Sequence, residues 1–157
     1  ARPCGLFLGR SSGGGILAVS VFLSAKQVVD LLTPGSHGST FGGNPLSCAV
    51  ALEALRIIED EHLCERCEDL GNTFLKSLKK LDYPCITDVR GKGLFIGIEF
   101  DARHIHARQV CERLMKNGIL TKDTHETVVR LAPPLVISEK ELDWALEKVT
   151  KTLDGLY

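Results

Sequence analysis

The sequence has no excess of charge of either sign and no long hydrophobic run. Lysine and arginine number 19 and aspartate and glutamate 20, for a net charge of −1, which argues against nucleic acid or an anionic membrane as the main partner. No apolar run reaches the roughly 18 residues that a transmembrane helix needs, and residues 1–10 lack the basic-then-apolar order of a secretory signal. The chain also opens without methionine. We therefore expect an internal piece of a longer protein in the cytoplasm, with the mitochondrial matrix as the alternative because a targeting segment would be out of view.

The cysteines lack the pattern of a metal site or of a disulfide framework. They stand at the irregularly spaced positions 4, 48, 64, 67, 85 and 111, which favours free, mostly buried thiols in a reducing compartment, Cys48 and Cys111 among apolar helical neighbours. Cys64-Glu-Arg-Cys67 is the exception to examine. A zinc site needs a second ligand pair, which does not follow. A thioredoxin-like pair would open a helix after a strand, whereas this one lies within a charged helical stretch. We expect no metal.

What is present is the composition of a globular protein. The 157 residues are 44% hydrophobic and 25% charged, which argues against disorder and predicts one domain or two at most. A chain of this size buries roughly 68–70% of its unfolded surface. It therefore needs neither disulfides nor a metal to hold a core.

Apolar runs and chain breakers divide the first part of the sequence. The expected elements are strands at 5–8 and 16–23, a helix at 24–32, a loop at 33–43 and a helix from 44 to about 61. Ser24 is a plausible cap for the first helix, and Asn44 followed by Pro45 begins the second. The second helix has an apolar stripe made of Ala49, Leu52, Leu55, Ile58 and Leu63. Because a lone strand pair is marginal, residues 1–32 need partners that this chain does not supply.

The remainder predicts a compact α+β unit over residues 84–157, preceded by a helix. The expected elements are helices at 64–81, 105–117 and 138–153 and strands at 86–89, 94–100, 119–121 and 127–131. A glycine-containing turn makes the first two strands a hairpin, Gly118 closes a helix, and Ser138 with Glu141 forms a capping box. The residues expected to face inward are Leu70, Phe74, Leu75, Leu78, Val110, Cys111, Leu114, Leu142, Leu146 and Val149.

The loop from Gly35 to Pro45 is a candidate phosphate site. Its glycines let the backbone approach a ligand closely. Ser39 and Thr40 add hydroxyl groups, and the loop leads into a helix N-terminus, which favours an anion. The alternative is an ordinary interdomain loop with a helix cap.

Arg130 is a candidate carboxylate site. It stands in an apolar strand that ends in two prolines, where its guanidinium could hold a ligand carboxylate through two hydrogen bonds. An internal salt bridge or a solvent-facing position is the alternative. Arg90 and Lys92 flank a turn and are expected to be solvated. The histidines fit structural or surface roles, and no Ser-His-Asp or Cys-His set can be assembled from the sequence.

Three blocks carry a family likeness. They are His37-Gly-Ser-Thr-Phe-Gly-Gly-Asn-Pro45, Arg90-Gly-Lys-Gly-Leu94 and Val129-Arg-Leu-Ala-Pro-Pro-Leu135. In this order they resemble the C-terminal part of class III pyridoxal-phosphate aminotransferases, and the likeness runs from about Leu8 onward. Within that family, Lys122-Asp-Thr-His125 resembles the ornithine-specific members.

The resemblance implies an α/β fold of type I, with residues 1–43 as the tail of the large cofactor-binding domain. Residues 44–157 would be connecting helices and an α+β C-terminal small domain. Ser39 and Thr40 would hold the phosphate of pyridoxal 5′-phosphate bound to a neighbouring subunit, which implies a homodimer. Arg130 would bind the substrate α-carboxylate. The reaction would pass the δ-amino group of ornithine to 2-oxoglutarate, giving glutamate semialdehyde and glutamate.

Position 10 departs from the family pattern. The family places its cofactor-binding lysine in a Leu-Gly-Lys block, and this chain has Leu8-Gly9-Arg10 there. Arginine offers no unprotonated amine for that bond. The chain also lacks the upstream half of the family. The alternatives are therefore a catalytically inactive dimerisation or binding module, or another class III member acting on acetylornithine or 4-aminobutyrate.

Overall fold

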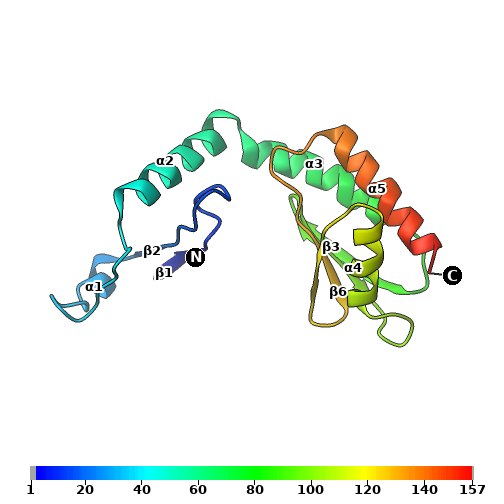
Figure 1. Cartoon of the computed structure of the whole chain (residues 1–157), viewed down its shortest axis with the longest axis horizontal. Helices are drawn as coiled ribbons and strands as arrows, with labels where there is room; N and C mark the ends of the chain where they lie inside the picture. The colour runs from blue at the N-terminus through cyan, green and yellow to red at the C-terminus, as the bar shows by residue number, and fades with distance from the viewer. Residues whose placement is uncertain (1–2, 157) are drawn as a thin grey trace. The chain divides into compact units, whose positions relative to one another are not determined.

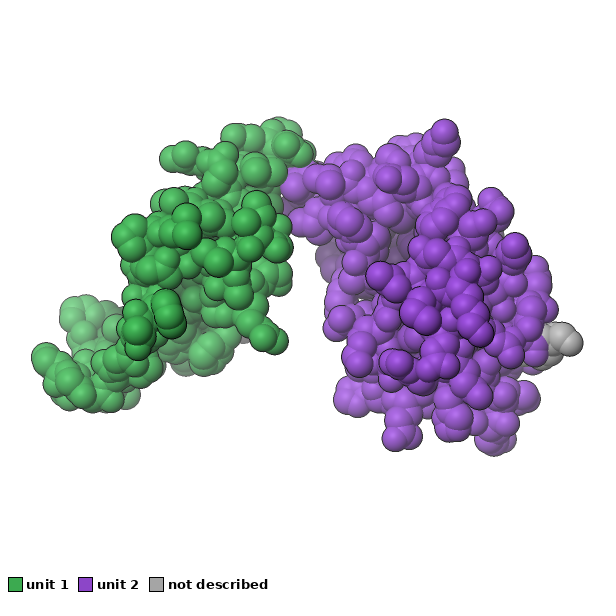
Figure 2. Space-filling view, in the orientation of Figure 1, with its two compact units in different colours: residues 1–62 green, residues 63–157 purple. Residues whose placement is uncertain are grey.

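The computed structural model describes residues 3–156, which fall into two compact units, 1–62 and 63–157 (Figure 2). They divide directly after His62, whose φ of 49° lies in the left-handed region. Within the described residues no helix is both long and apolar enough to cross a membrane. The expectation that residues 1–43 belong to a larger domain stays a prediction.

The first unit contains a two-stranded antiparallel sheet and two helices (Figure 1). Its elements are β1 (Gly5–Leu8), β2 (Val21–Ser24), α1 (Lys26–Val29) and α2 (Pro45–Asp60). Gly5 pairs with Ser24 and Leu8 with Val21, and the Phe7 and Phe22 rings stack at 4.5 Å. Residues 5–7 and 21–23 are exposed, and no described element covers them, which agrees with the expectation that residues 1–32 need partners outside this chain.

The prediction of a strand at 16–23 and of a helix at 24–32 is wrong in its bounds. Turns close over the glycine run, with Ile16 N–H donating to the Gly13 carbonyl, so strand pairing starts only at Val21. Ser24 does not cap α1. Its hydroxyl donates to the Cys4 carbonyl at 2.5 Å, and Ala25 stands at the cap position.

Helix α2 begins as predicted. The Asn44 side-chain oxygen accepts a hydrogen bond from Ser47 N–H at 2.9 Å, and Pro45 occupies the first turn. The predicted stripe, however, is not covered by any described part of the chain. Leu52 and Leu55 are 58% and 51% exposed, and no α2 residue is buried. Leu63, assigned to the same stripe, is buried but belongs to the second unit.

The second unit is an antiparallel four-stranded sheet with three helices (Figure 1). Its elements are α3 (Leu63–Leu78), β3 (Ile86–Lys92), β4 (Phe95–Phe100), α4 (Ala107–Lys116), β5 (Lys122–Thr124), β6 (Val128–Leu131) and α5 (Glu139–Asp154). The strand order is β3-β4-β6-β5. The predicted hairpin at 86–100 and the capping box of Ser138 and Glu141 are confirmed.

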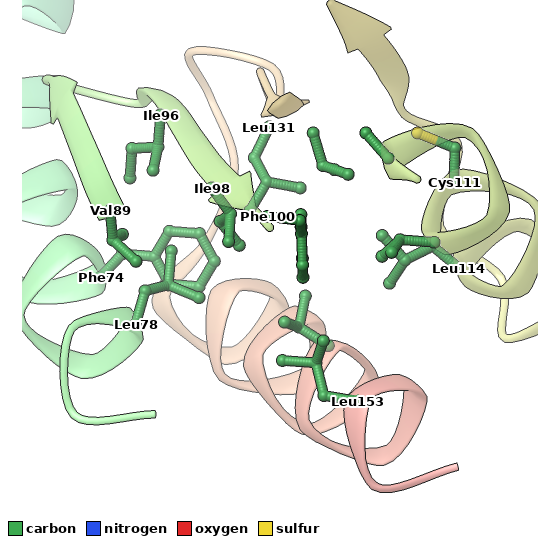
Figure 3. Packing of buried hydrophobic residues seen from close by; sticks show 14 of the residues in the cluster. Phe74, Leu78, Val89, Ile96, Ile98, Phe100, Cys111, Leu114, Leu131 and Leu153 are labelled. Carbon is green, nitrogen blue, oxygen red and sulfur yellow. The ribbon is translucent and has the colours of Figure 1, made fainter. Parts of the chain in front are cut away.

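One face of this sheet packs against helix side chains to form the core (Figure 3). Alternation along β4 turns Ile96, Ile98 and Phe100 inward and leaves Phe95, Gly97 and Glu99 on the other face. The helices contribute Phe74, Leu78, Val110, Leu114, Leu142, Val149 and Leu153. The predicted inward positions are confirmed, with Leu70, Leu75 and Leu146 partly buried.

Two strand predictions are wrong in ways that matter for the site. Ile119 N–H donates to the Leu114 carbonyl and so finishes the end of α4, which moves β5 from 119–121 to Lys122–Thr124. Strand β3 runs on to Lys92, so Arg90 and Lys92 lie in a paired strand, and the turn is made at Gly93 with φ of 54°.

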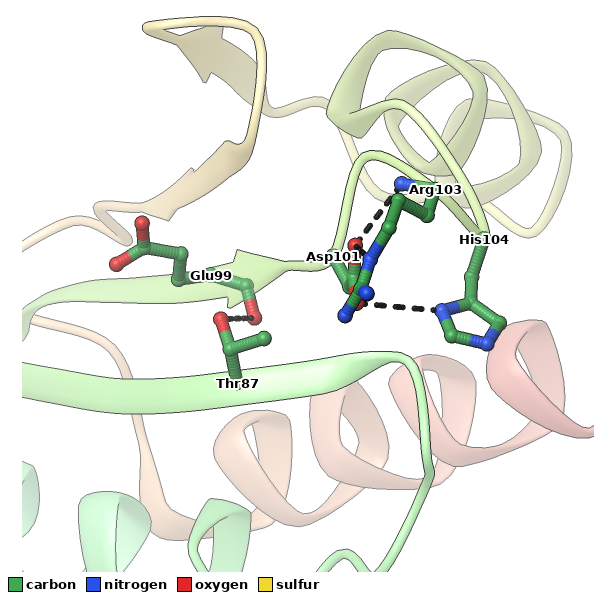
Figure 4. A network of polar contacts seen from close by, with 5 residues as sticks. All are labelled: Thr87, Glu99, Asp101, Arg103 and His104. Atoms are coloured by element: carbon green, nitrogen blue, oxygen red, sulfur yellow. Dashed lines mark hydrogen bonds and ion pairs between the residues drawn. The ribbon is translucent and has the colours of Figure 1, made fainter.

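The connection from β4 to α4 is held by polar contacts around Asp101 (Figure 4). Its carboxylate accepts hydrogen bonds from the backbone and guanidinium of Arg103 at 2.6–3.0 Å and lies 3.5 Å from His104 Nδ1. The Arg103 hydrogen bonds hold the pKa of Asp101 well below its usual range. These hydrogen bonds close the loop locally.

All six cysteines are free, as predicted, but only half of them are buried. Cys67, Cys85 and Cys111 are buried, and Cys4, Cys48 and Cys64 are exposed. Cys48 is exposed because α2 has no cover in its own unit.

Candidate functional site

A row of long cationic side chains crosses the open face of the four-stranded sheet. The register aligns Arg90 with Gly97, Gly97 with Arg130, and Arg130 with Lys122. These residues alternate with core residues such as Ile98 and Val129 along their strands, which puts them on the face away from the helices. The sheet therefore carries cations across its whole width on its open side.

Arg130 differs from the other arginine of the row in its partners. Arg90 pairs with Asp88 at 2.7 Å and with Glu99, and the Asp88 and Glu99 hydrogen bonds raise the pKa of Arg90. Arg130 is exposed and forms no ion pair with any described residue. Of the two expected alternatives, the internal salt bridge is not found within residues 3–156 and the solvent-facing position is. The guanidinium is therefore accessible to solvent and to a ligand.

Two neighbours shape the surroundings of Arg130. Its guanidinium carbon lies 5.7 Å from the centre of the Phe95 ring, a cation–π contact. Gly97, the residue directly across from Arg130 on β4, has no side chain of its own, and Val128 Cγ1 lies 3.1 Å from where its Cβ would stand. The strand is fixed on its other side, since the Thr121 hydroxyl donates to the Arg130 carbonyl at 2.6 Å. The guanidinium is exposed, so a planar carboxylate can approach it from solvent.

Sequence reasoning missed Phe95 and Gly97 because they lie more than thirty positions from Arg130 in the chain. Alternation along β4 could have shown that they share a face, but only the pairing of β4 with β6 brings that face to Arg130. Lys122 belongs to the stretch that resembles the ornithine-specific members of the family, and it lies across from Arg130 on β5.

The loop before α2 presents its hydroxyls to solvent. Residues 36–43 are exposed, and the Ser39 hydroxyl accepts a hydrogen bond from Gly42 N–H at 3.0 Å, which closes a tight turn. Gly43 has φ of 70°, a left-handed conformation that favours glycine. No described residue hydrogen-bonds the Thr40 side chain. The Thr40 hydroxyl is thus free to meet an anion before α2, whose Ser47 N–H is already capped by Asn44.

Arg10 follows β1 in an exposed turn. Its carbonyl accepts a hydrogen bond from Val19 N–H at 3.3 Å, and Ser12 N–H bonds back to the Gly9 carbonyl. Arg10, Ser39 and Thr40 belong to the first unit and Arg130 to the second. Their assigned roles stay predictions.

An apolar hollow of about 640 Å³ in the second unit offers little to a charged ligand. Apolar side chains that include Phe74, Leu120 and Trp144 line it. Its one lining carboxylate, Glu141, is committed to Ser138 in the capping box. The open sheet face is the better candidate.

Comparison with known proteins decides the family. The family model for aminotransferase class-III matches residues 4–153. The chain belongs to the class-III aminotransferases.

The relatives of this class-III aminotransferase chain include bacterial ornithine aminotransferases. It is 52% identical over 148 residues to that of Halalkalibacterium halodurans, which covers 94% of this chain and 36% of the relative. It is 50% identical to that of a Geobacillus species, covering 95% of this chain and 37% of the relative. The chain therefore spans little more than a third of the length of these relatives.

Solved structures agree on the fold. The ornithine delta-aminotransferase of Plasmodium falciparum superposes with a TM-score of 0.93 at 39% identity, covering 99% of this chain and 41% of that one. An acetylornithine aminotransferase from Elizabethkingia anophelis gives a TM-score of 0.88 at 43% identity, covering 99% and 40%. The predicted α/β fold of a pyridoxal-phosphate-dependent aminotransferase is confirmed.

Proposed function

We propose that the chain is the C-terminal part of an ornithine aminotransferase, in which Arg130 binds a substrate carboxylate. The observation that carries the proposal is an exposed guanidinium without an ion-pair partner in the described residues, lying over Phe95 and opposite Gly97. Bidentate binding of a carboxylate suits this fork-shaped donor. The relatives named above are ornithine aminotransferases and support ornithine as the amino donor. We propose 2-oxoglutarate as the acceptor, as the family resemblance implies.

The phosphate end of pyridoxal 5′-phosphate fits the first unit. Ser39 and Thr40 offer exposed hydroxyls immediately before the N-terminus of α2, where the helix dipole favours a phosphate. Bound cofactor supplies an electron sink for amino-group transfer. In the proposed homodimer these hydroxyls serve the phosphate held by the partner subunit.

Residue 10 does not fit the covalent attachment of the cofactor. A guanidinium cannot supply the free amine that the attachment needs, so Arg10 leaves this role unfilled. This observation favours a second candidate function, a catalytically inactive module that dimerises or binds ligand. The acetylornithine aminotransferase likeness favours a third, a class-III enzyme with a different amino donor.

A segment exchange tests the three candidates together. The 148-residue segment of the Halalkalibacterium halodurans enzyme that aligns with this chain is replaced by the chain's own residues, once with Arg10 and once with Arg10→Lys. We expect the Arg10→Lys chimera to transaminate ornithine with 2-oxoglutarate and the Arg10 chimera to be inactive. Size-exclusion chromatography and circular dichroism show whether each chimera is a folded dimer.

Each other outcome assigns a different function. A folded Arg10→Lys dimer without transaminase activity supports the binding module. Faster turnover of acetylornithine or 4-aminobutyrate than of ornithine supports another class-III activity. Activity of the Arg10 chimera equal to that of Arg10→Lys contradicts the role given to position 10.

A further inference from the structure

Cys64 and Cys67 lie one helical turn apart at the beginning of α3. The helix starts at Leu63, one residue before the expected start, so Cys64 lies in its first turn and Cys67 in its second. Cys64 is exposed and Cys67 is 9% exposed. Both line a hollow of about 400 Å³ together with Glu68, Lys92 and Phe95. An exposed thiol thus stands beside a recessed one at the edge of a space open to small molecules.

The spacing of the two thiols is compatible with a disulfide. Helix rise and radius put Cα atoms three residues apart at about 5 Å, inside the range of roughly 4.4–6.8 Å seen across disulfides. The Cβ atoms must approach by about 1–2 Å from the usual helical separation. The first turn can tighten on the Cys64 side, because the N–H groups of residues 63–66 have no intrahelical partners to lose.

The two thiols have different surroundings, which suits different roles. Burial, followed by the nearby Cys64 sulfur, raises the pKa of the Cys67 thiol, so Cys67 stays protonated while Cys64 meets solvent. The Cys67 thiol donates a weak hydrogen bond to the Leu135 carbonyl at 3.8 Å, and the Arg66 guanidinium donates to the Ile137 carbonyl. The start of α3 therefore holds the segment that follows Arg130 on β6.

We propose that Cys64 and Cys67 form a reversible dithiol–disulfide site that reacts with small-molecule disulfides. The Cys64 thiolate attacks one sulfur of the small disulfide, the S–S bond breaks, and one small thiol leaves with the proton from Cys64. The Cys67 sulfur then attacks the Cys64 sulfur of the mixed disulfide and releases the second small thiol with the Cys67 proton. The protein loses two electrons and two protons, and the small disulfide gains them. The thiol donor to Leu135 is lost in the product.

The test uses the whole chain and oxidised glutathione as the probe. The reduced chain is equilibrated with graded ratios of reduced to oxidised glutathione, its remaining thiols are alkylated, and it is digested with trypsin. Trypsin cleaves after Arg66, between the two cysteines. We expect peptides 57–66 and 67–76 from monomeric protein to stay joined until reductant is added, and Cys48, an exposed cysteine on another helix, to give only glutathione adducts.

Three serine variants separate the site from general thiol reactivity. Cys64→Ser should abolish the joined peptides, Cys67→Ser should trap glutathione on Cys64, and the matched control Cys48→Ser should leave the joined peptides at their original level. Circular dichroism of each variant checks that α3 is retained. Absence of joined peptides at every glutathione ratio in the folded parent, or their persistence in Cys64→Ser, overturns the proposal.

Hydrogen exchange measures whether the state of the two cysteines affects residues 135–137, which follow β6. We expect oxidation to raise amide exchange in residues 135–137 by several-fold, with no change in residues 139–154 of α5. Unchanged exchange in 135–137 in a chain that carries the disulfide refutes the coupling to that segment. None of these measurements depends on transaminase activity.

Discussion

Replacing Arg130 by alanine should weaken substrate binding far more than it weakens the fold. In the structure the guanidinium is exposed, contacts the Phe95 ring at 5.7 Å and forms no ion pair with another described residue. An exposed cation–π contact contributes about 0.5–1 kcal/mol. The free energy of unfolding should therefore fall by no more than about 1 kcal/mol in Arg130→Ala.

The loss in ligand binding is expected to be larger. A charge-assisted hydrogen-bonded pair contributes about 1.5–3 kcal/mol, and each 1.4 kcal/mol corresponds to a tenfold change in an equilibrium constant. KM for a carboxylate substrate should rise by roughly 10-fold to 150-fold in Arg130→Ala. Arg130→Lys should recover only part of this, because an ammonium group cannot make the bidentate contact.

Steady-state kinetics on the Arg10→Lys chimera measure this difference, with urea unfolding of the same proteins for stability. Arg90→Ala is the matched control, since Arg90 lies in the same row but is already paired with Asp88 and Glu99. We expect Arg90→Ala to leave KM nearly unchanged. An unchanged KM in Arg130→Ala, or an equal rise in both variants, would refute the carboxylate role of Arg130.

Three further changes test other parts of the structure. Gly71→Ala places a Cβ only 2.2 Å from the Gly93 carbonyl. We expect the free energy of unfolding to fall, because overpacking costs about 1–3 kcal/mol or more and the gain in helix propensity is only about 1 kcal/mol. A variant more resistant to urea than the parent would contradict this packing. Thr40→Ala in the active chimera should weaken retention of pyridoxal phosphate by roughly 10-fold to 150-fold, from one charge-assisted hydrogen bond of about 1.5–3 kcal/mol. Dialysis followed by absorbance measures cofactor retention, and the control Ser36→Ala should leave it unchanged. Equal retention in Thr40→Ala and the parent would show that Thr40 does not bind the cofactor phosphate. The hydrogen bond to Asp154 raises the pKa of Tyr83 to about 12, above the unfolded-state value of about 10. The stability that this bond contributes is therefore complete below pH 10 and is lost as the pH rises toward 12. Ultraviolet titration should show a late phenolate signal that Tyr83→Phe removes, and a Tyr83 signal at the ordinary pH would show that the bond is absent in solution.

Local chemistry explains which elements could be predicted from the sequence. The cap of α2 depends on Asn44 and Ser47, three positions apart, and the capping box of α5 depends on Ser138 and Glu141 at the same spacing. Alternation within β4 likewise separates its core face from its open face without knowledge of any partner strand. These features need only residues that are neighbours in the chain.

Contacts between distant residues explain what the sequence left undetermined. The apolar stripe on α2 is typical of a helix face that packs in a core, but no α2 residue is buried in this structure. Its burial depends on elements outside its unit. The strand at 119–121 was misplaced because Ile119 completes α4 through Leu114, and β5 forms only where it can pair with β6. An apolar pattern predicts that a face will be buried, but it does not predict which other element covers that face.

The family likeness, the type and order of most elements, and Arg130 as a candidate carboxylate ligand follow from local residue types and motifs. Strand pairing and packing are needed to see that Arg130 forms no ion pair within the described chain and lies over Phe95 and across from Gly97. They also show that Cys64 is exposed while Cys67 is buried. The physical reason is strand register and helix packing. A shift of one residue between β4 and β6 would turn a different set of side chains toward the open face, and no local pattern sets that register.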